Sequence, residues 1–429
     1  MAERSPAVQE KSASRAMALV HELLREYQPR NFAVELWDGS RWDPHAGQFC
    51  RFTWRINHAG ALRAAFRSDR QVALGEAYIY DDCDIFGDIL AIFQLAEHLS
   101  EKHFSAAEKL RLSGLLLGLP SKPHVGHTGA SPNGKLHSRF RDQQAVSFHY
   151  DVSNDFYQLW LDPAMVYSCA YFRSPEDSLD AAQTQKLDYI CRKLRLRPGQ
   201  SLLDIGCGWG GLILHATRNY GVHATGITLS RQQLRLAKER IEAAGLSSCC
   251  EVYLLDYRDA SRLGSFDKLV SVGMVEHVGL SGLPAYFESA YRLLKPGGVF
   301  LNQGIGRAGS RPKPTQPTFT DVYVFPDGDM IPISDLLGCA ERTGFAVRDV
   351  ENLREHYFLT LCQWLRRLEA KAEQARNLVG DLKYRIWRLY LAGSAYYFQS
   401  GKLELYQSLL VKGASGHSGI PLTREDWYR

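Results

Sequence analysis

The sequence lacks the features of a membrane-spanning, disulfide-linked or strongly charged protein. No apolar run approaches the roughly 18 residues that a membrane span needs. The nine cysteines are scattered, without a C-x-x-C pair or a metal-ligand spacing. The formal net charge is only +4, too small to indicate a nucleic-acid-binding protein, and the first residues carry no apolar signal core. We therefore expect a cytoplasmic protein with free thiols, no metal site and no nucleic-acid partner.

The length of the chain predicts more than one domain. With 429 residues it exceeds one ordinary hydrophobic core. Residues 119–144 are rich in Pro, Gly, Ser and His, which is typical of a linker. The expected division is an N-terminal domain over 1–118, the linker over 119–144, a second domain over 145–415 and a polar C-terminal tail over 416–429 that forms a surface arm.

The N-terminal region predicts a small α/β domain. Residues 1–14 are expected to be disordered, with Ser14 capping a helix over 15–27. Asp38-Gly39 is a hairpin signal between two short strands, and residues 84–99 read as a strongly apolar helix. The apolar stripe of the first helix and the basic end of the linker suggest a face that docks on anionic lipid, although such a basic cluster is more often simply solvated. That stripe consists of Met17, Val20, Leu23 and Leu24, and the basic cluster of Lys135, Arg139 and Arg141.

The stretch SLLDIGCGWGG, residues 201–211, predicts a ligand site at a strand-to-helix turn. Its glycines, Gly206 and Gly208 among them, allow a tight turn and the close approach of a ligand. The spacing G-x-G-x-x-G alone would also admit a dinucleotide. Asp204 lies inside the strand, however. The next strand ends in Thr228, whereas a dinucleotide site has an acidic residue there that binds the ribose. The pattern favours the S-adenosylmethionine (SAM) site of class I methyltransferases over NAD or a purely structural turn.

Strand and helix patterns alternate after residue 178, which predicts a doubly wound, seven-stranded, mostly parallel Rossmann-like α/β sheet. Two helices, over about 358–378 and 383–399, separate the last two strands. The expected strands are 201–205, 222–228, 250–255, 267–272, 298–303, 345–351 and 403–411, and the expected helices before them are 179–194, 210–219, 230–244 and 283–294.

Ligands of open parallel sheets lie outside the carboxyl ends of the strands. Thr228, Asp256 and Glu276 follow or end such strands here. Glu276 stands in the apolar stretch VGMVEHVG, where a carboxylate is costly unless it is paired or hydrogen-bonded. This makes Glu276 a candidate functional residue, with a helix cap or an ion pair as the structural alternative.

Five motifs carry a resemblance to a known family: HYDVSNDFYQLWLDPAMVYSCAYF, LLDIGCGWGG, GITLSRQQ, MVEHVG and HY-x-L-TL. They resemble the cyclopropane-fatty-acyl-phospholipid synthases and the related mycolic-acid methyltransferases, over residues 145–410. Residues 15–118 are similar to the small N-terminal lipid-binding domain of the bacterial phospholipid synthases. The resemblance implies a methyltransferase that acts on membrane phospholipids and binds peripherally to the inner face of the membrane, with a homodimer as the expected assembly.

The resemblance also implies the chemistry. A cis double bond of an acyl chain attacks the methyl of SAM, and loss of a proton from the resulting carbocation closes a cyclopropane ring. The family's base resembles a bound bicarbonate, held by side chains matching Cys169, Glu276 and Tyr357 and by a backbone group matching Ile305. Gln303 stands where the family usually has histidine, and a glutamine amide donates hydrogen bonds but does not titrate. Proton loss by another route would give a methylene-branched chain, and later reduction a methyl-branched one.

The same resemblance assigns residues to SAM and to the cation. His149 and Asp151 are candidates for supporting the segment that covers SAM, with an ordinary surface position as the equal alternative for either. The residues carried over for SAM are Tyr150 and Ser168 with Gly206 and Gly208 at its amino-acid end, Thr228 and Gln233 at the ribose, Asp256 and Tyr257 at the adenine, and Asp204 in the first strand. Aromatic faces can stabilise a carbocation, and the candidates are Tyr167, Tyr171, Phe172 and Tyr357.

Two other functions stay open at this point. The chain could be a SAM methyltransferase for a soluble small molecule, with an N-terminal domain that serves dimerisation or docking. It could also be a lipid-binding protein that has kept the fold and lost turnover, which the Gln303 departure allows.

Overall fold

The computed structural model describes residues 6–65, 70–121, 129–130, 132–150, 152–310, 315–414 and 418–428. Its contacts divide the chain into two compact units. The first unit takes its residues from 1–129, 314–323 and 380–396, and the second from 130–313, 324–379 and 397–429. The domain boundaries expected from the sequence stay a prediction, and the clustering differs from them by placing two later segments in the first unit. Asp151 lies outside the described residues.

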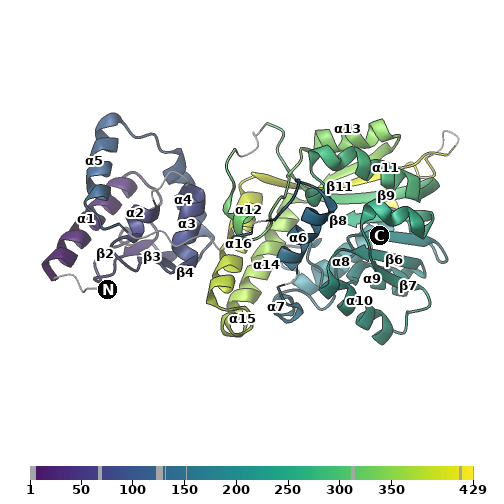
Figure 1. The fold of residues 1–429 in the computed structure, drawn as a ribbon, viewed down its shortest axis with the longest axis horizontal. Coiled ribbons are helices and arrows are strands. Elements are labelled where there is room, and N and C mark those ends of the chain that lie inside the picture. The colour runs from purple at the N-terminus through teal and green to yellow at the C-terminus, as the bar shows by residue number, and fades with distance from the viewer. Residues whose placement is uncertain are drawn as a thin grey trace. The chain divides into compact units, whose positions relative to one another are not determined.

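The second unit is built on the predicted seven-stranded sheet, in the order β10-β11-β9-β8-β5-β6-β7 (Figure 1). Strands β5 to β9 pair in parallel, and β11 runs antiparallel between β9 and β10. The strands are β5 Ser201–Ile205, β6 His223–Thr228, β7 Cys250–Leu254, β8 Phe266–Val272, β9 Leu294–Arg307, β10 Ala346–Asn352 and β11 Leu403–Val411. The expected fold class and all seven strands are confirmed.

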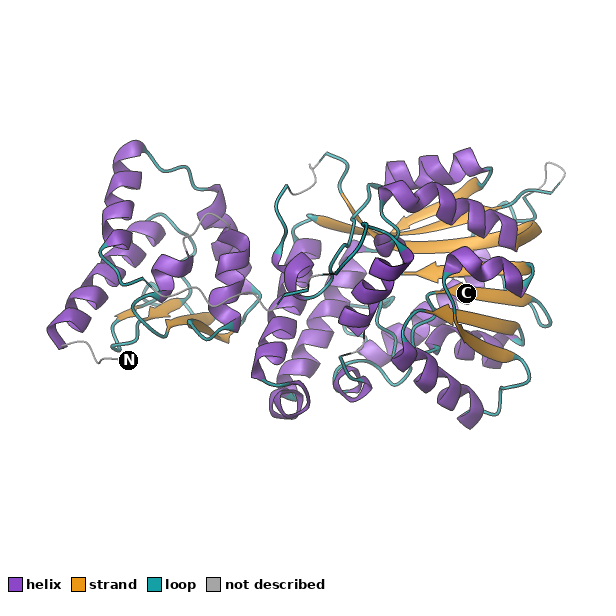
Figure 2. Cartoon of the chain, viewed as in Figure 1, coloured by secondary structure: helices purple, strands orange, loops and turns teal. Residues whose placement is uncertain are grey.

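Helices cover both faces of this sheet (Figure 2). Successive strand residues point to opposite faces, so Leu202 joins the core under α8 to α10 while Leu203 joins the core under α11 and α13. The continuous apolar runs of β5 and β9 follow from this double burial. The helices are α8 Leu179–Leu194, α9 Gly211–Tyr220, α10 Arg231–Ala243, α11 Leu283–Leu293 and α13 Ile333–Thr343.

The helices beside the sheet differ from the expected ones in two places. The single helix expected over 358–378 is wrong, because the chain forms α14 Arg354–Ala370 and a separate α15 Ala372–Val379. Helix α6, Arg139–Tyr150, begins inside the segment expected to be a linker. The other elements are α7 Asn154–Gln158, α12 Phe319–Tyr323, which belongs to the first unit, and the 3-10 turns η1 Tyr257–Leu263, η2 Val275–His277, η3 Leu280–Gly282 and η4 Glu425–Trp427.

The first unit contains a four-stranded sheet in the order β2-β1-β3-β4. The predicted hairpin is confirmed, since β1 and β2 pair antiparallel around Asp38-Gly39. The apolar helix expected over 84–99 is wrong at its start, because Ile85 pairs with Trp54 of β3 and the helix begins only at Ala91. The strands are β1 Ala33–Glu35, β2 Arg41–Trp42, β3 Phe52–Ile56 and β4 Cys83–Gly87, and the helices α1 Pro6–Leu24, α2 Ala61–Ala65, α3 Arg70–Ile79, α4 Ala91–Glu101 and α5 Ala106–Leu117.

Most of α16, Asp381–Gln399, belongs to the first unit despite its late position in the sequence. Arg385 donates to the carbonyls of Tyr78 and Cys83 at 2.8 Å each, and its guanidinium pairs with Asp84 at 2.7 Å. Arg388 donates to the carbonyl of Ile85 at 3.1 Å. Buried guanidinium groups therefore satisfy backbone carbonyls of α3 and of β4, the edge strand of this sheet.

Two expectations about the N-terminal helix are wrong. Helix α1 begins at Pro6, so Ser14 lies inside the helix and does not cap it. Val20, Leu23 and Leu24 of its apolar stripe are buried core residues, because the helix turns this face inward. No helix among the described residues has the length and apolarity to cross a bilayer.

The basic cluster of the linker is already partnered. Arg139 makes a bidentate pair with Asp259, at 2.8 and 3.0 Å, and Arg141 pairs with Asp327 at 2.6 Å. These guanidinium groups hold α6 to the second unit. Both arginines therefore already pair with carboxylates, and the docking of this cluster on lipid headgroups stays a prediction.

The C-terminal tail is anchored, which corrects the expectation of a surface arm. Trp427 is 2% exposed and belongs to the core cluster under α8. The guanidinium of Arg195 lies 5.2 Å from its ring centroid and pairs with Asp426 at 2.7 Å. The apolar body of the indole, which the polar composition of the tail concealed, explains the anchoring.

We predict that Trp427→Ala lowers the free energy of unfolding by about 3–5 kcal/mol, because it leaves a cavity the size of an indole in that core. Chemical denaturation measures the change. Leu422→Ala in the same tail is the control, because Leu422 is fully exposed and its loss should change stability by less than about 0.5 kcal/mol. Equal stability of the two variants would contradict the anchoring.

Candidate active site

The glycine turn joins β5 to α9 with backbone angles that side chains rarely adopt. Gly206 has φ +90° and Gly208 has φ +55°. A Cβ placed on Gly206 would lie 3.3 Å from the side chain of Met274. The turn needs glycine at position 206 both for its conformation and for the space beside Met274.

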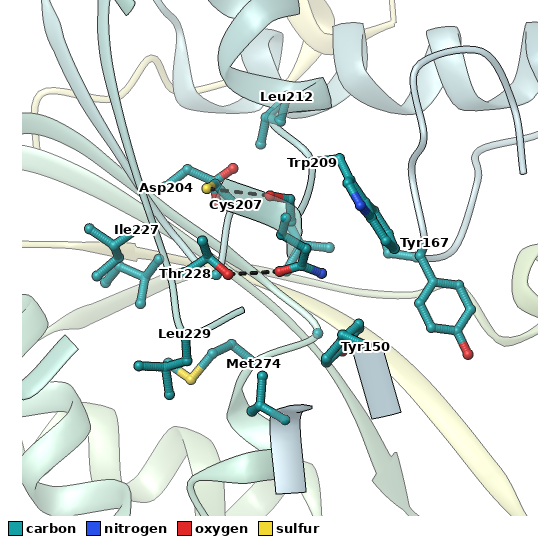
Figure 3. Close-up of a pocket in the computed structure, with 18 of the residues that line it drawn as sticks. Tyr150, Tyr167, Asp204, Cys207, Trp209, Leu212, Ile227, Thr228, Leu229 and Met274 are labelled. Carbon is teal, nitrogen blue, oxygen red and sulfur yellow. Dashed lines mark hydrogen bonds between the residues drawn. The ribbon is translucent and has the colours of Figure 1, made fainter. Parts of the chain in front are cut away.

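A pocket opens directly above this turn, at the carboxyl ends of the parallel strands (Figure 3). It encloses about 1150 Å³ of space outside protein atoms, the open solvent at its mouth included, which suffices for a nucleoside-sized ligand. Figure 3 shows Tyr150, Tyr167 and Trp209 on one side of the pocket, with Ile227 and Leu229 on the other. The predicted cofactor residues all line this one pocket: Tyr150, Ser168, Asp204, Gly206, Gly208, Thr228, Gln233, Asp256 and Tyr257.

A buried lysine, Lys186, and a buried carboxyl, Asp204, both line the pocket. Lys186 of α8 donates to the hydroxyl of Ser168 at 2.9 Å. Burial lowers the pKa of Lys186 to about 8. Burial raises the pKa of Asp204 to about 7, and the nearby Lys186 opposes that rise. This end of the pocket therefore holds a carboxylate and an ammonium whose charges a zwitterionic ligand can complement.

The opposite end is ordered by Arg258. Its guanidinium donates to both oxygens of Asp256, at 2.7 and 2.6 Å, and to Asp142 of α6 at 3.0 Å. Hydrogen bonds from Arg258 hold the pKa of Asp256 below its usual value although burial opposes them. The bidentate pair fixes the Asp256 carboxylate at the pocket wall and joins it to α6.

Thr228 and Gln233 form a second fixed pair on the wall. The hydroxyl of Thr228 donates to the side-chain carbonyl of Gln233 at 2.7 Å, so the amide nitrogen of Gln233 remains available to a ligand (Figure 3). Thr228 ends β6, and Ser230 caps α10 by accepting from the backbone amide of Gln233 at 3.2 Å. The cap explains why this residue is presented at the pocket.

Glu276 is buried beside the pocket floor that Met274, His277 and Val278 help to form. It is 2% exposed, and burial raises its pKa to about 7. Its Oε1 accepts from the backbone amide of Ile305 at 2.7 Å. Its Oε2 has no hydrogen-bond partner among the described residues. A buried carboxyl with one open oxygen is costly without a ligand, which marks it as a functional group.

The other predicted catalytic residues lie outside the lining of the pocket but share one neighbourhood. The thiol of Cys169 is 3.9 Å from the carbonyl of Leu353, which also accepts from the backbone amide of Tyr357 at 3.1 Å. The amide of Leu353 donates to Leu405 at 2.7 Å, and Leu405 is the cross-strand partner of Ile305. This chain of contacts connects Cys169 and Tyr357 to the strand that holds Glu276.

The protonation state of the Cys169 thiol limits its chemical role. Burial raises the pKa of its thiol well above the ordinary value, so it stays a neutral S–H. Its nearer acceptor is the carbonyl of Ala170 at 3.2 Å. A neutral thiol serves as a weak donor and not as a nucleophile.

Gln303 lies on β9, two residues before Ile305. Its Oε1 accepts from the side-chain amide of Gln407 at 2.8 Å. Gln407 is its direct cross-strand partner on β11, and both side chains are buried. The residue at the unusual position is therefore held by a partner from the neighbouring strand.

The predicted aromatic residues divide into two groups. Tyr167 lines the pocket and packs against Trp364 at 5.1 Å between ring centroids. Tyr171 stacks on His356 at 4.8 Å, and the backbone amide of Phe172 donates to His356 at 3.0 Å. His149 is buried and bonded to the carbonyl of Val324 at 2.8 Å, and its expected supporting role stays a prediction.

Among the pocket residues to which sequence reasoning assigned no role are Lys186, Trp209 and Arg258. Lys186 sits on the inward face of an amphipathic helix at a position that the apolar pattern alone would fill with an apolar residue, and this break in the pattern is the signal that could have found it. Trp209 lies within the glycine turn and donates to Asn154 at 2.8 Å. Arg258 is two residues after Asp256, a spacing that carries no recognisable signal.

Comparisons with known proteins agree with this geometry. The family model described as "Mycolic acid cyclopropane synthetase" matches residues 137–408, and one described as a domain of unknown function matches residues 19–108. The "Probable fatty acid methyltransferase" of Pseudomonas putida is 40% identical over 92% of this chain and 96% of its own. The "Cyclopropane-fatty-acyl-phospholipid synthase" of Escherichia coli K12 is 37% identical over 64% of this chain and 69% of its own.

A solved structure is similar as well. The mycolic acid cyclopropane synthase CmaA1, complexed with SAH and CTAB, superimposes with a TM-score of 0.59 at 34% identity, over 62% of this chain and 97% of that chain. The first family model spans more than half of the sequence. This chain therefore belongs to the mycolic acid cyclopropane synthetase family and has the fold of a class I SAM-dependent methyltransferase.

Proposed function

We propose that this protein transfers a methyl group from SAM to the cis double bond of an unsaturated acyl chain in a phospholipid and closes a cyclopropane ring. The observation that carries the proposal is Glu276, a buried carboxyl with one open oxygen beside a SAM-sized pocket. The names of the relatives in Pseudomonas putida and Escherichia coli support an acyl chain as the acceptor.

The pocket fits SAM by its shape and charge. The space that a Cβ on Gly206 would fill lets the ligand approach the backbone. Ser168 and Tyr150 would hold the amino-acid end, with Lys186 beside its carboxylate. The ribose would lie at Thr228 and Gln233 and the adenine at Asp256 and Tyr257, with Asp204 on the floor. When bound, SAM supplies a methyl group activated by its sulfonium.

Orientation and exclusion of water are the contributions of the protein to methyl transfer. The alkene attacks in line with the breaking sulfur–carbon bond, the thioether leaves, and a carbocation remains on the neighbouring chain carbon. Tyr167 and Tyr357, which both pack against Trp364, would offer aromatic faces to that cation, and the bound substrates would exclude water from it. The cation then loses a proton from the added methyl group, and the resulting electron pair closes the ring.

Bicarbonate fits the region around Glu276 as the acceptor of that proton. The open Oε2 of Glu276 can accept from its hydroxyl, and the amide nitrogen of Gln303 and the hydroxyl of Tyr357 can donate to its oxygens. Cys169 adds a weak thiol donor. The amide of Ile305 already donates to Glu276, so its part is to orient that carboxyl.

A second product is favoured by one observation. Gln303 cannot carry charge, so an anion is held less firmly here than beside a charged histidine. Slower proton loss leaves time for another route, which would yield a methylene branch and, after reduction, a methyl branch. The cyclopropane and the branched products share the methyl transfer and differ only after it.

The lipid substrate implies contact with a membrane. We place the protein at the inner face of the cytoplasmic membrane, peripherally bound, with a homodimer as its expected assembly. The first unit exposes Leu110 and Leu117 of α5, 77% and 68% accessible and seven residues apart on one helix face. These side chains replace the buried α1 stripe as the candidates for insertion at the lipid surface.

We predict that SAM labelled in its methyl group transfers label to phospholipid vesicles that contain cis-unsaturated acyl chains. Scintillation counting of the extracted lipid measures the transfer, and vesicles of fully saturated chains are the control. Label appearing only in soluble acceptors would replace the lipid substrate with a small molecule. Bound SAM without any transfer would indicate a lipid-binding protein that has lost turnover.

A further inference from the structure

A buried lysine stands at the far end of the hydrogen bonds that hold Gln303. Lys193, near the end of α8, is 1% exposed and donates to the side-chain oxygen of Gln407 at 3.0 Å. Gln407 donates to the side-chain oxygen of Gln303 at 2.8 Å. These three side chains form a relay, Lys193–Gln407–Gln303, that ends on the strand carrying Ile305.

The ammonium of Lys193 is fixed by acidic partners. It bonds to Glu351 and lies 3.6 Å from Asp349, both on β10. Glu351 also accepts from the hydroxyl of Tyr189 at 2.9 Å, and Asp349 pairs with Arg424 of the tail at 2.7 Å. Two carboxylates lie within ion-pair distance of this buried ammonium, so its position is determined.

A lysine has donors and no acceptor, and this decides the direction of the relay. The oxygen of Gln407 must face Lys193, so its nitrogen faces Gln303. The oxygen of Gln303 must then face Gln407, which leaves its nitrogen as the outer end. Reversing either amide would place donor against donor in a buried site and lose the hydrogen bonds.

The outer end of the relay is an unfilled donor. The Nε2 of Gln303 has no protein acceptor within the part of the chain that the structure describes. Gln303 and Ile305 are two residues apart on one strand face, about 7 Å, and the amide of Ile305 holds Glu276. Gly304, which stands between them, lies close to the open oxygen, since a Cβ built on it would be 3.9 Å from Oε2 of Glu276.

We propose that Lys193 and Gln407 are positioning residues that fix the amide of Gln303 with its N–H donors toward an oxyanion bound beside Glu276, taken here as bicarbonate. This inference rests on the proposed function for the identity of the anion. In this way an uncharged side chain serves as a dedicated anion donor, because a buried cation two side chains away sets its orientation.

Gln407→Glu tests the direction of the relay. A carboxylate at position 407 keeps the bond to Lys193 and offers only an acceptor to Gln303, so the amide of Gln303 turns and presents its oxygen to the anion. We expect the affinity for ¹³C-bicarbonate, measured by NMR line broadening without lipid, to fall about 10-fold or more. SAM affinity stays at the wild-type value.

Two further variants make the result specific. Gln407→Met removes the relay without reversing it, so a smaller loss of bicarbonate affinity is expected, together with a raised bicarbonate requirement for turnover. Ser408→Ala is the control on the same strand, because its buried hydroxyl has no partner among the described residues and it belongs to neither the relay nor the pocket. Melting temperatures check that all three variants are folded.

The outcomes separate this inference from the proposed function. If both Gln407→Glu and Gln407→Met bind bicarbonate with wild-type affinity, the relay is overturned, even where lipid is methylated. The relay is equally overturned if the wild-type protein binds no bicarbonate. Bicarbonate binding that depends on Gln407 in a protein that methylates no lipid supports the relay and overturns the proposed function.

Discussion

Glu276→Gln is expected to reduce turnover by about 100-fold or more while SAM affinity stays within about 2-fold of wild type. The amide keeps the size of the side chain and its place beside Ile305. It replaces, however, the open carboxylate oxygen that would accept a hydrogen bond from the bicarbonate hydroxyl. Steady-state turnover with unsaturated vesicles and calorimetric SAM titration measure the two quantities. Loss of SAM affinity with retained turnover per bound cofactor would show that the role assigned to Glu276 is wrong.

The pH profile adds a second test of Glu276. Burial raises its pKa to about 7, so the carboxyl is largely protonated below that pH and ionised above it. Only the ionised form offers both carboxylate oxygens as acceptors, one to the amide of Ile305 and one to the bicarbonate hydroxyl, so wild-type turnover at saturating SAM should rise as pH increases through about 7. The rise should be absent in Glu276→Gln and unchanged in Glu288→Gln, an exposed acid on α11.

Asp204 titrates in the same range but reports on a different quantity. Its pKa is also raised to about 7 by burial, and it lines the SAM pocket. Its ionisation should therefore appear in the pH dependence of SAM affinity. Measuring turnover at saturating SAM separates the two carboxyl groups.

Gly206→Ala is expected to weaken SAM binding by about 30-fold or more, equivalent to about 2 kcal/mol. The added Cβ lies 3.3 Å from Met274 and on a backbone with φ +90°, so the turn must move at the pocket floor. Isothermal titration with SAM measures the change. Wild-type affinity in a folded Gly206→Ala protein would contradict the position of the ligand.

Gly199→Ala is the matched control for backbone strain. Gly199 has φ +79°, and a Cβ there meets nothing within 4 Å. It precedes β5, at the end of the strand remote from the pocket. Both variants should lose about 1–2 kcal/mol of stability, and only Gly206→Ala should lose SAM affinity.

The sheet could be predicted because its signals are local. Five parallel strands are short apolar runs separated by helices of clear periodicity, and Gly206 marks the turn after the first of them. The errors came where tertiary contacts decide. Ile85 is as apolar as a helix core requires, but pairing with Trp54 makes it part of β4. Trp427 lies in a polar tail, and only the core that receives it shows that it is buried.

The candidate site divides in the same way. Residues that follow the strands, such as Asp256 and Thr228, could be placed at one pocket because parallel strands end at one edge. Lys193 and Gln407 could not, because they are 214 positions apart in the sequence and meet only through the antiparallel strand β11. Their relation to Gln303 depends on cross-strand register, which residue types do not encode.

The most direct test of the central claim uses SAM with a fully deuterated methyl group and vesicles of cis-unsaturated phospholipid. The account predicts that the extracted acyl chains gain one carbon that retains two of its three deuterium atoms, with the third lost as the proton removed from the carbocation, and that proton NMR shows a cyclopropane ring. A deuterium NMR resonance of an alkene =CD2 group in place of a ring CD2 group would assign the methylene-branched product. Acyl chains without deuterium, from protein that has consumed SAM, would contradict methyl transfer to lipid.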